Sequence, residues 1–96
     1  MRKEEVYRKT KETEVQVSVN LDGEGKAAVD TGVAFLDHLL TSLATHSLID
    51  ITAKVKGDLR HHSVEDLAIG LGDALNKALG TREGIVRFGY AAAPMD

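Results

Sequence analysis

The stretch from Gly57 to Gly80, GDLRHHSVEDLAIGLGDALNKALG, decides the fold, because it joins a helix-length apolar pattern to ionisable side chains at its start. Apolar residues that recur every three or four positions form one stripe on a helix, and such a stripe packs against another layer. The stripe consists of Val64, Leu67, Ala68, Leu71, Ala74, Leu75 and Ala78. We therefore expect a helix that lies on a sheet.

A polar pair and three glycines predict how this helix begins, ends and packs. Ser63 with Asp66 three residues later is typical of a capping box, so the helix is expected to begin there. Gly80 suits the left-handed position that ends a helix. Gly70 and Gly72 each cost about 1 kcal/mol of helix propensity relative to Ala, and close packing against the sheet would account for both.

Three segments precede this helix. The alternation in ETEVQVSVNLDGEGKAAVD, with DGEG as turn chemistry, predicts a β-hairpin from Thr10 to Asp30. Leucines at helical spacing in VAFLDHLLTSLATHS predict a helix over 33–47, and the alternation in LIDITAKVKGD predicts a strand over 48–58. This ββαβα order predicts an α+β fold of two layers, a mixed sheet with both helices on one face. Residues 81–96 are expected to form an irregular tail.

The composition limits the size of the fold and the kind of partner. Ninety-six residues make one domain with a single core. A net charge of -3 lacks the broad basic field that nucleic acid or an acidic membrane surface requires. The absence of cysteine excludes disulfides and thiolate metal sites, and with no apolar run of ~18 residues we expect a cytoplasmic protein. A small molecule or another protein is the expected partner.

His61, His62 and Glu65 form a candidate metal site at the start of the Gly57–Gly80 helix. Residues three and four apart are neighbours on a helix, so Glu65 would reach both histidines. Adjacent residues point about 100° apart, so the two imidazoles would serve two metals more naturally than one. Two histidines and a carboxylate suit Mn, Fe, Co, Ni or Zn. The pattern alone leaves this metal site and a solvated surface as equal alternatives.

Four other residues are ambiguous by themselves. His38 lies on a polar arc opposite the leucine stripe of the first helix, and His46 follows eight residues later. A histidine in the position of His38 is more often solvated than functional. His46 could be an end-of-helix histidine that the helix dipole stabilises. Glu12 alone is an ordinary exposed strand glutamate, and Arg87 an ordinary tail arginine. Their interest depends on a wider pattern.

That pattern is carried by KETEVQVSVNLDGEG, TGVAFLDHLLTSLATHS, HHSVEDLAIGLGDALNKALG and GIVRFGYAAAPMD, in this order and spacing. The chain resembles the N-terminal half of the imidazoleglycerol-phosphate dehydratase family over nearly all of its length. The resemblance implies that residues 1–96 form a single half-domain, the N-terminal repeat, with a ribosomal protein S5 domain 2-like fold. It also implies a homo-oligomer with two manganese ions (Mn²⁺) per site between subunits, and partners that include neither nucleic acid nor a membrane.

The resemblance also assigns roles to individual residues. It implies that His38, His62 and Glu65 ligate one metal and that His61 ligates the other. These four residues would line the substrate position, where Glu12, His46 and Arg87 would also contact substrate. Glu12 and Glu65 are the implied catalytic carboxylates. The implied reaction is the dehydration of D-erythro-imidazole glycerol phosphate (imidazole glycerol phosphate) to imidazole acetol phosphate, a lyase reaction of histidine biosynthesis. Arg87 would suit the substrate phosphate because a guanidinium binds oxygens in a fork.

Two departures from the family pattern limit this assignment. Family members have a second half with further histidines and basic residues, so we hypothesise that two copies of this chain combine, His61 of one completing the ligands of the other. The family also places about five residues between the GD and HH pairs, in a loop before the site, whereas only Leu59 and Arg60 intervene here. Three hypotheses stay open: a dehydratase, a half-domain that assembles without turnover, and an interaction module with incidental histidines.

Overall fold

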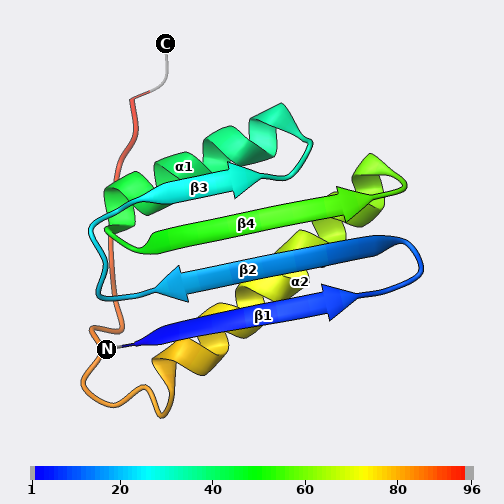
Figure 1. The fold of residues 1–96 in the computed structure, drawn as a ribbon. Helices are drawn as coiled ribbons and strands as arrows, with labels where there is room; N and C mark the ends of the chain where they lie inside the picture. The colour runs from blue at the N-terminus through cyan, green and yellow to red at the C-terminus, as the bar shows by residue number, and fades with distance from the viewer. Residues whose placement is uncertain (1, 95–96) are drawn as a thin grey trace.

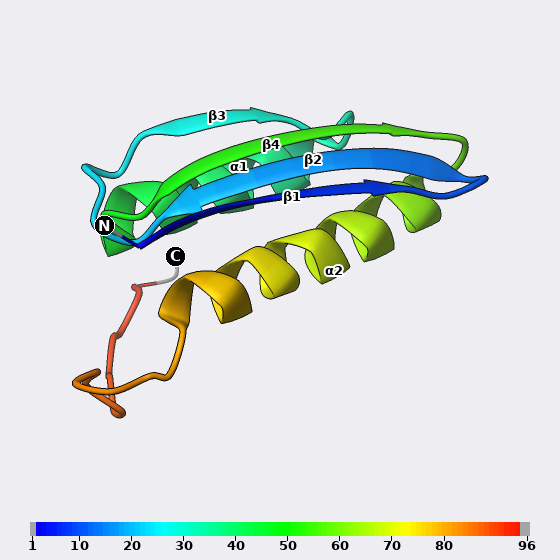
Figure 2. The same ribbon diagram turned by 60° about the horizontal axis from the view of Figure 1, so that its bottom comes forward.

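The computed structural model describes residues 2–94 as a four-stranded mixed sheet with two α-helices on one face (Figures 1 and 2). This confirms the predicted α+β class, the mixed sheet and the placement of both helices. The last two residues of the GIVRFGYAAAPMD motif, Met95 and Asp96, lie outside the described residues. The elements are β1 (Lys3–Lys9), β2 (Thr13–Asn20), β3 (Ala27–Asp30), α1 (Ala34–Ser47), β4 (Asp50–Gly57) and α2 (Arg60–Leu79).

Strand β1 was not predicted, and it gives the order β1-β2-β4-β3 instead of a three-stranded sheet. Its sequence, KEEVYRK, contains mostly charged residues, and only Val6 is buried, opposite Val17 of β2. Charged side chains are common on edge strands because they oppose pairing with other chains. The charged residues that suit β1 to the edge of the sheet therefore also prevent its prediction from apolar alternation.

The predicted hairpin from Thr10 to Asp30 is wrong. β2 pairs antiparallel with β1 and β4, whereas β3 pairs parallel with β4. The parallel pair follows from α1, because a helical crossover returns the chain to the starting end of the sheet before the next strand begins. The connection from β2 to β3 is held by Asp50, whose Oδ1 accepts hydrogen bonds from the backbone N–H groups of Glu24, Gly25 and Lys26 at 2.9, 3.0 and 2.9 Å.

The core lies between the sheet and the helices. Inward residues alternate along β2 and β4 as the sequence predicted, and Val15, Val17 and Ile51 are at most 2% exposed. Helix α1 contributes Leu40 and Ala44, and α2 contributes a longer row. The buried residues of α2 are Ser63, Asp66, Leu67, Gly70, Ala74 and Ala78.

The start and buried face of α2 differ from the prediction. The helix begins at Arg60 after the extended residue Leu59, so Ser63 is not a cap, and the predicted capping box is wrong. Ser63 and Asp66 instead face the sheet, which turns Val64 and Ala68 towards the surface. At the other end, Gly80 ends the helix as expected with a positive φ of 58°, but its ψ of -127° lies outside the predicted left-handed helical region. Since α2 starts three residues earlier, both histidines lie inside its first turn.

The two glycines within α2 also differ from each other. A Cβ on Gly70 would meet Val15 Cγ1 at 3.3 Å and Val17 Cγ2 at 3.5 Å, which confirms the predicted close packing at this position. A Cβ on Gly72 would have no atom within 4 Å, so the same prediction is wrong there. Within residues 2–94, no helix has the length and apolar character to cross a membrane.

Substitution of the two glycines should therefore have opposite effects. Gly72→Ala should raise the free energy of unfolding by about 0.5–1 kcal/mol, because helix propensity improves without any clash. Gly70→Leu should lower it by roughly 1–3 kcal/mol, because the side chain would have to displace β2. Urea denaturation of both variants measures these changes. Equal destabilisation by both substitutions would contradict the described approach of α2 to β2.

Candidate functional site

Three connections meet at one end of the sheet: the β1–β2 turn, the β3–α1 connection and the β4–α2 connection (Figure 1). Glu12 lies in the β1–β2 turn and His38 in the second turn of α1, while three candidate residues occupy the first two turns of α2. These three residues are His61, His62 and Glu65. Five of the seven predicted site residues therefore lie at one end of the molecule.

His46 and Arg87 lie at the other end. His46 is in the last turn of α1, and Arg87 follows the C-terminal end of α2, where its Nη2 donates to the carbonyl oxygen of Arg82 at 3.4 Å. Both are exposed. A substrate that contacted His61 and Arg87 of the same chain would have to span the length of the sheet. These two residues are therefore separated from the other five within one chain.

His61 pairs with Glu65 one helical turn later. The Nε2 atom of His61 lies 3.3 Å from Oε2 of Glu65, and the side chains are 78% and 59% exposed. The i,i+4 spacing on a helix brings them together. The sequence predicted that Glu65 could reach both histidines. In the structure its carboxylate pairs with His61. A histidine and a carboxylate side by side at the surface offer two metal-ligating groups to an ion that approaches from outside.

His62 has a different partner, Asp58, in the β4–α2 connection. Its Nδ1 lies 2.8 Å from Asp58 Oδ1, and the carboxylate accepts the Nδ1 proton. This hydrogen bond and the Asp58 charge raise the pKa of His62, and the charges of Glu12 and Asp66 add to the effect. The same hydrogen bond lowers the pKa of Asp58. Because Nδ1 carries the proton, Nε2 is the ring nitrogen available to a metal.

The two imidazoles diverge as the helical geometry predicts. Their ring centroids lie 5.8 Å apart, and the ring planes are inclined by 54°. Each ring also has its own carboxylate partner, Glu65 for His61 and Asp58 for His62. The two rings therefore point in different directions, and imidazole and carboxylate are groups that divalent transition metals accept as ligands.

Within residues 2–94, no group of three or more His, Cys, Asp or Glu side chains is arranged to hold a metal ion. His38 is exposed on α1, which covers the β3 side of the sheet, whereas α2 covers the β1 and β2 side. The predicted ligands thus lie at the same end of the molecule without forming a closed coordination shell in a single chain. A complete shell would need groups from another polypeptide segment.

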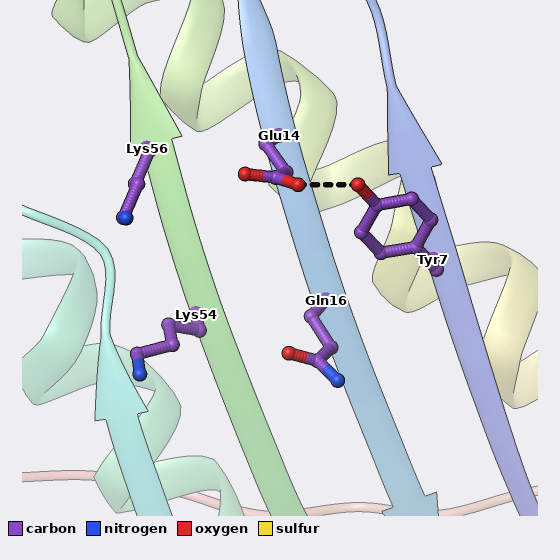
Figure 3. Close-up of a pocket in the computed structure, with 5 residues that line it drawn as sticks. All are labelled: Tyr7, Glu14, Gln16, Lys54 and Lys56. Carbon is purple, nitrogen blue, oxygen red and sulfur yellow. Dashed lines mark hydrogen bonds between the residues drawn. The ribbon is translucent and has the colours of Figure 1, made fainter.

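A separate hollow lies on the opposite face of the sheet, away from both helices (Figure 3). It has a volume of about 220 Å³. The Tyr7 hydroxyl donates to the Glu14 carboxylate across this hollow, which lowers the pKa of Glu14. None of the predicted site residues lines it. Its lining residues are Tyr7, Glu14, Gln16, Lys54 and Lys56.

Three residues near the site were not identified as functional from the sequence. Asp58 holds His62, and Thr13 donates a hydrogen bond to Asp66 in the interior. Two signals were present in the sequence. Asp58 precedes His62 by four residues, and Thr13 occupies an inward position of the Val15, Val17, Val19 alternation, where a polar side chain is unusual.

The fold and the site together define a class of protein: an α+β half-domain that presents histidine and carboxylate ligands at one end of its sheet. A family model described as imidazoleglycerol-phosphate dehydratase matches residues 31–96, which is more than half of the chain. The chain belongs to the imidazoleglycerol-phosphate dehydratase family.

Individual relatives agree with this assignment. The chain is 59% identical to the imidazoleglycerol-phosphate dehydratase of Methanopyrus kandleri and 52% identical to that of Nitrosomonas eutropha, with all of this chain and 49% and 51% of those proteins covered. The crystal structure of the Staphylococcus aureus enzyme superposes with a TM-score of 0.82 at 30% identity, over 98% of this chain and 52% of that one. The chain therefore spans about half the length of the relatives it matches.

The relatives also carry positions that this chain lacks. Both sequence alignments run over 99 positions, whereas the chain has 96 residues, so at least three positions have no counterpart here. This number equals the shortening expected between Gly57 and His61. In the structure only Asp58 and Leu59 connect β4 to α2, and Asp58 still holds His62.

The Asp58–His62 contact predicts a pH dependence. The contact stabilises the folded protein through His62. This stabilisation is fully present below 6.5, the pKa of His62 in the unfolded chain, and is lost as the pH rises through the higher pKa of His62 in the folded protein. The stabilisation through Asp58 is fully present above pH 3.8, the ordinary pKa of an aspartate, and is lost as the pH falls through the lower pKa of Asp58 in the folded protein. Asp58→Ala should return the pKa of His62 towards 6.5, measured by NMR titration of its ring protons. Asp22→Ala, which removes a carboxylate paired with Arg2, is the control and should leave His62 unchanged. An unaltered His62 titration in Asp58→Ala would contradict the contact.

Proposed function

We propose that this half-domain contributes one half of the metal site of a dehydratase that converts imidazole glycerol phosphate to imidazole acetol phosphate. The observation that carries the proposal is the divergence of His61 and His62, whose ring centroids lie 5.8 Å apart with the ring planes inclined by 54°. In the proposed assembly, His38, His62 and Glu65 of one copy hold one Mn²⁺, and His61 of a second copy completes its ligands. Two such sites form where two copies meet.

The residues of the chain have distinct tasks in this proposal. Mn²⁺ held by these residues would supply positive charge to the imidazole ring of the substrate. Dehydration also requires a group that accepts a carbon-bound proton and a group that protonates the departing hydroxyl. Glu12 is the exposed carboxylate at the same end of the sheet as the histidines, so it is assigned this proton transfer. Asp58 holds His62 through Nδ1, so Nε2 would be the nitrogen that ligates the metal.

The separation of Arg87 from the histidines supports the participation of two copies. Within one chain Arg87 and His46 lie at the end of the sheet opposite to His61. If both contact substrate, they do so at a site whose metal ligands come from another copy. A phosphate of the substrate would then be held by a guanidinium of one copy while its ring is held by the histidines of the other.

The surface of α1 also supports association. Phe35, Leu39 and Leu43, spaced four residues apart, are 70%, 48% and 43% exposed. They form one stripe along the helix, and a contiguous apolar stripe of this kind marks an interaction surface more often than an ordinary monomer surface. We propose that this stripe is covered in the assembly.

A half-domain that assembles without turnover is the second candidate. The observation that favours it is length, because the chain spans about half of the relatives that carry the enzyme name. Such a protein would still place His61 and His62 at the start of α2 and would still bind metal. Turnover is therefore the measurement that separates the two candidates.

Association can be tested at the α1 stripe. Leu39→Glu should convert the assembled protein to smaller species in native mass spectrometry, because burial of an unpaired carboxylate in an apolar contact is strongly unfavourable. Thr41→Glu, at an exposed position of the same helix, is the matched control and should assemble normally. A protein that stays monomeric before any substitution, with Mn²⁺ present, would contradict the proposed assembly.

Metal binding and turnover can be tested together. His61→Ala and Glu65→Ala should each weaken Mn²⁺ binding by at least about 100-fold, since loss of an outer hydrogen-bonding partner alone costs roughly 10–100-fold. His46→Ala should leave the Mn²⁺ content unchanged, because this residue is assigned a contact with the substrate and not with the metal. Metal analysis of the purified assembly gives the stoichiometry, and formation of imidazole acetol phosphate gives the activity. Metal with turnover supports the dehydratase, metal without turnover supports the second candidate, and unchanged metal content in both variants overturns the proposed ligands.

A further inference from the structure

Two polar side chains, Thr13 and Asp66, contact each other directly in the interior of the sheet–α2 interface. The Thr13 hydroxyl donates to Asp66 Oδ2 at 2.5 Å, and the two residues are only 4% and 9% exposed. A buried carboxylate is costly unless it is hydrogen-bonded, and an apolar pair would satisfy the same space at lower cost. The neighbouring positions of the same two elements do hold apolar residues, Val15 and Leu67. The polar contact is therefore not explained by packing.

The contact joins the two segments that carry the candidate site. Thr13 is the first residue of β2 and directly follows Glu12, while Asp66 lies in α2 directly after Glu65 and one turn beyond His62. The two partners are 53 residues apart in sequence. A single hydrogen bond thus connects the β1–β2 turn to the first two turns of α2.

A chain of hydroxyl groups continues the connection to Glu12. The Thr13 hydroxyl lies 3.3 Å from the Thr10 hydroxyl, which accepts hydrogen bonds from the backbone N–H groups of Glu12 at 3.1 Å and Thr13 at 3.0 Å. Because the Thr13 proton goes to Asp66, the Thr10 hydroxyl is the donor between the two threonines. The backbone of Glu12 is therefore linked to Asp66 through two hydroxyls, which we name the Thr10–Thr13–Asp66 relay.

A second link closes the arrangement. The backbone N–H of Asp58 donates to the carbonyl oxygen of Glu12 at 3.0 Å, and the Asp58 side chain holds His62. Glu12 is thus tied to the start of α2 both through the interior and through the surface. Two links of this kind fix an orientation, whereas one would leave the turn able to rotate about it.

We infer that the Thr10–Thr13–Asp66 relay is a positioning device that holds the Glu12 carboxylate in register with the histidines at the start of α2. Thr13 and Asp66 are positioning residues, since they are buried and hydrogen-bonded to each other and would act through Glu12. The inference rests on the proposed function for its chemical meaning. The structural part of the inference, that the Thr13 hydroxyl holds the β1–β2 turn against α2, is independent of that function.

Thr13→Val tests the relay because valine has nearly the same shape as threonine and favours a strand. In the metal-free protein, amide hydrogen exchange at Glu12 and Asp58 should become roughly tenfold faster, while exchange at the central positions Val17 and Ala53 stays unchanged. Thr13→Ser, which keeps the hydroxyl, should restore the slow exchange. Tyr7→Phe removes a hydrogen bond to Glu14 on the outer face of the same strand pair and is the matched control. Unchanged exchange at Glu12 in Thr13→Val would overturn the inference.

Bound Mn²⁺ gives a second readout, because the ion broadens the NMR signals of nearby amides. Broadening of the Glu12 amide should decrease in Thr13→Val while the affinity for Mn²⁺ is retained, and Thr13→Ser should behave as the unsubstituted protein. In an active assembly, kcat should fall roughly tenfold with KM unchanged. A loss of Mn²⁺ affinity equal to that of Glu65→Ala would overturn a positioning role. If no variant binds Mn²⁺, the proposed function fails and the exchange measurement alone decides the inference.

Discussion

The close approach of α2 to β2 at Gly70 is the constraint on which the rest of the structure depends. With no side chain at this position, the helix lies directly over Val15 and Val17, which are fully buried in the middle of the sheet. Once the helix axis is fixed there, its first turns reach the end of the sheet where β1 turns into β2. The approach therefore places the histidines at the same end of the sheet as Glu12, whose charge contributes to the raised pKa of His62.

The same constraint explains why polar residues occur on the buried face of α2. The face that turns towards the sheet carries Leu67, Gly70 and Ala74 in the centre but Ser63 and Asp66 near the start. A Cβ on Gly57 would lie 2.1 Å from Ser63 Oγ, so the end of β4 and the start of α2 are also in close contact. Apolar packing holds the middle of the helix, and hydrogen bonds hold the end that carries the candidate site. Hydrogen bonds depend on direction, so they fix the orientation of this end more narrowly than apolar contact could.

Local patterns predicted the elements better than their partners. The alternation of β2 and β4, both helices and the two-layer arrangement followed from the periodicity, because each depends on residues close in sequence. The pairing of β2 was wrong, since alternation does not specify which strand lies beside another. β1 was missed because Glu4 and Arg8 lie on the same face as its one buried residue, Val6, and interrupt the apolar pattern. The start of α2 was misplaced by three residues because Ser63 and Asp66 have the spacing of a cap but are used for burial.

The candidate site shows the same division between local and distant information. Helical spacing predicted that His61 and His62 diverge and that Glu65 lies near them, and family resemblance supplied His38 and Glu12. Neither helical spacing nor family resemblance identified Asp58 or Thr13, because each matters only through its contact with a residue that the fold brings close. Asp58 meets His62 because the β4–α2 connection contains just two residues, and Thr13 meets Asp66 across 53 positions of sequence. A connection of two residues and a buried hydroxyl thus fix contacts at this end of the sheet that the sequence pattern does not reveal, because each contact joins residues that only the fold brings together.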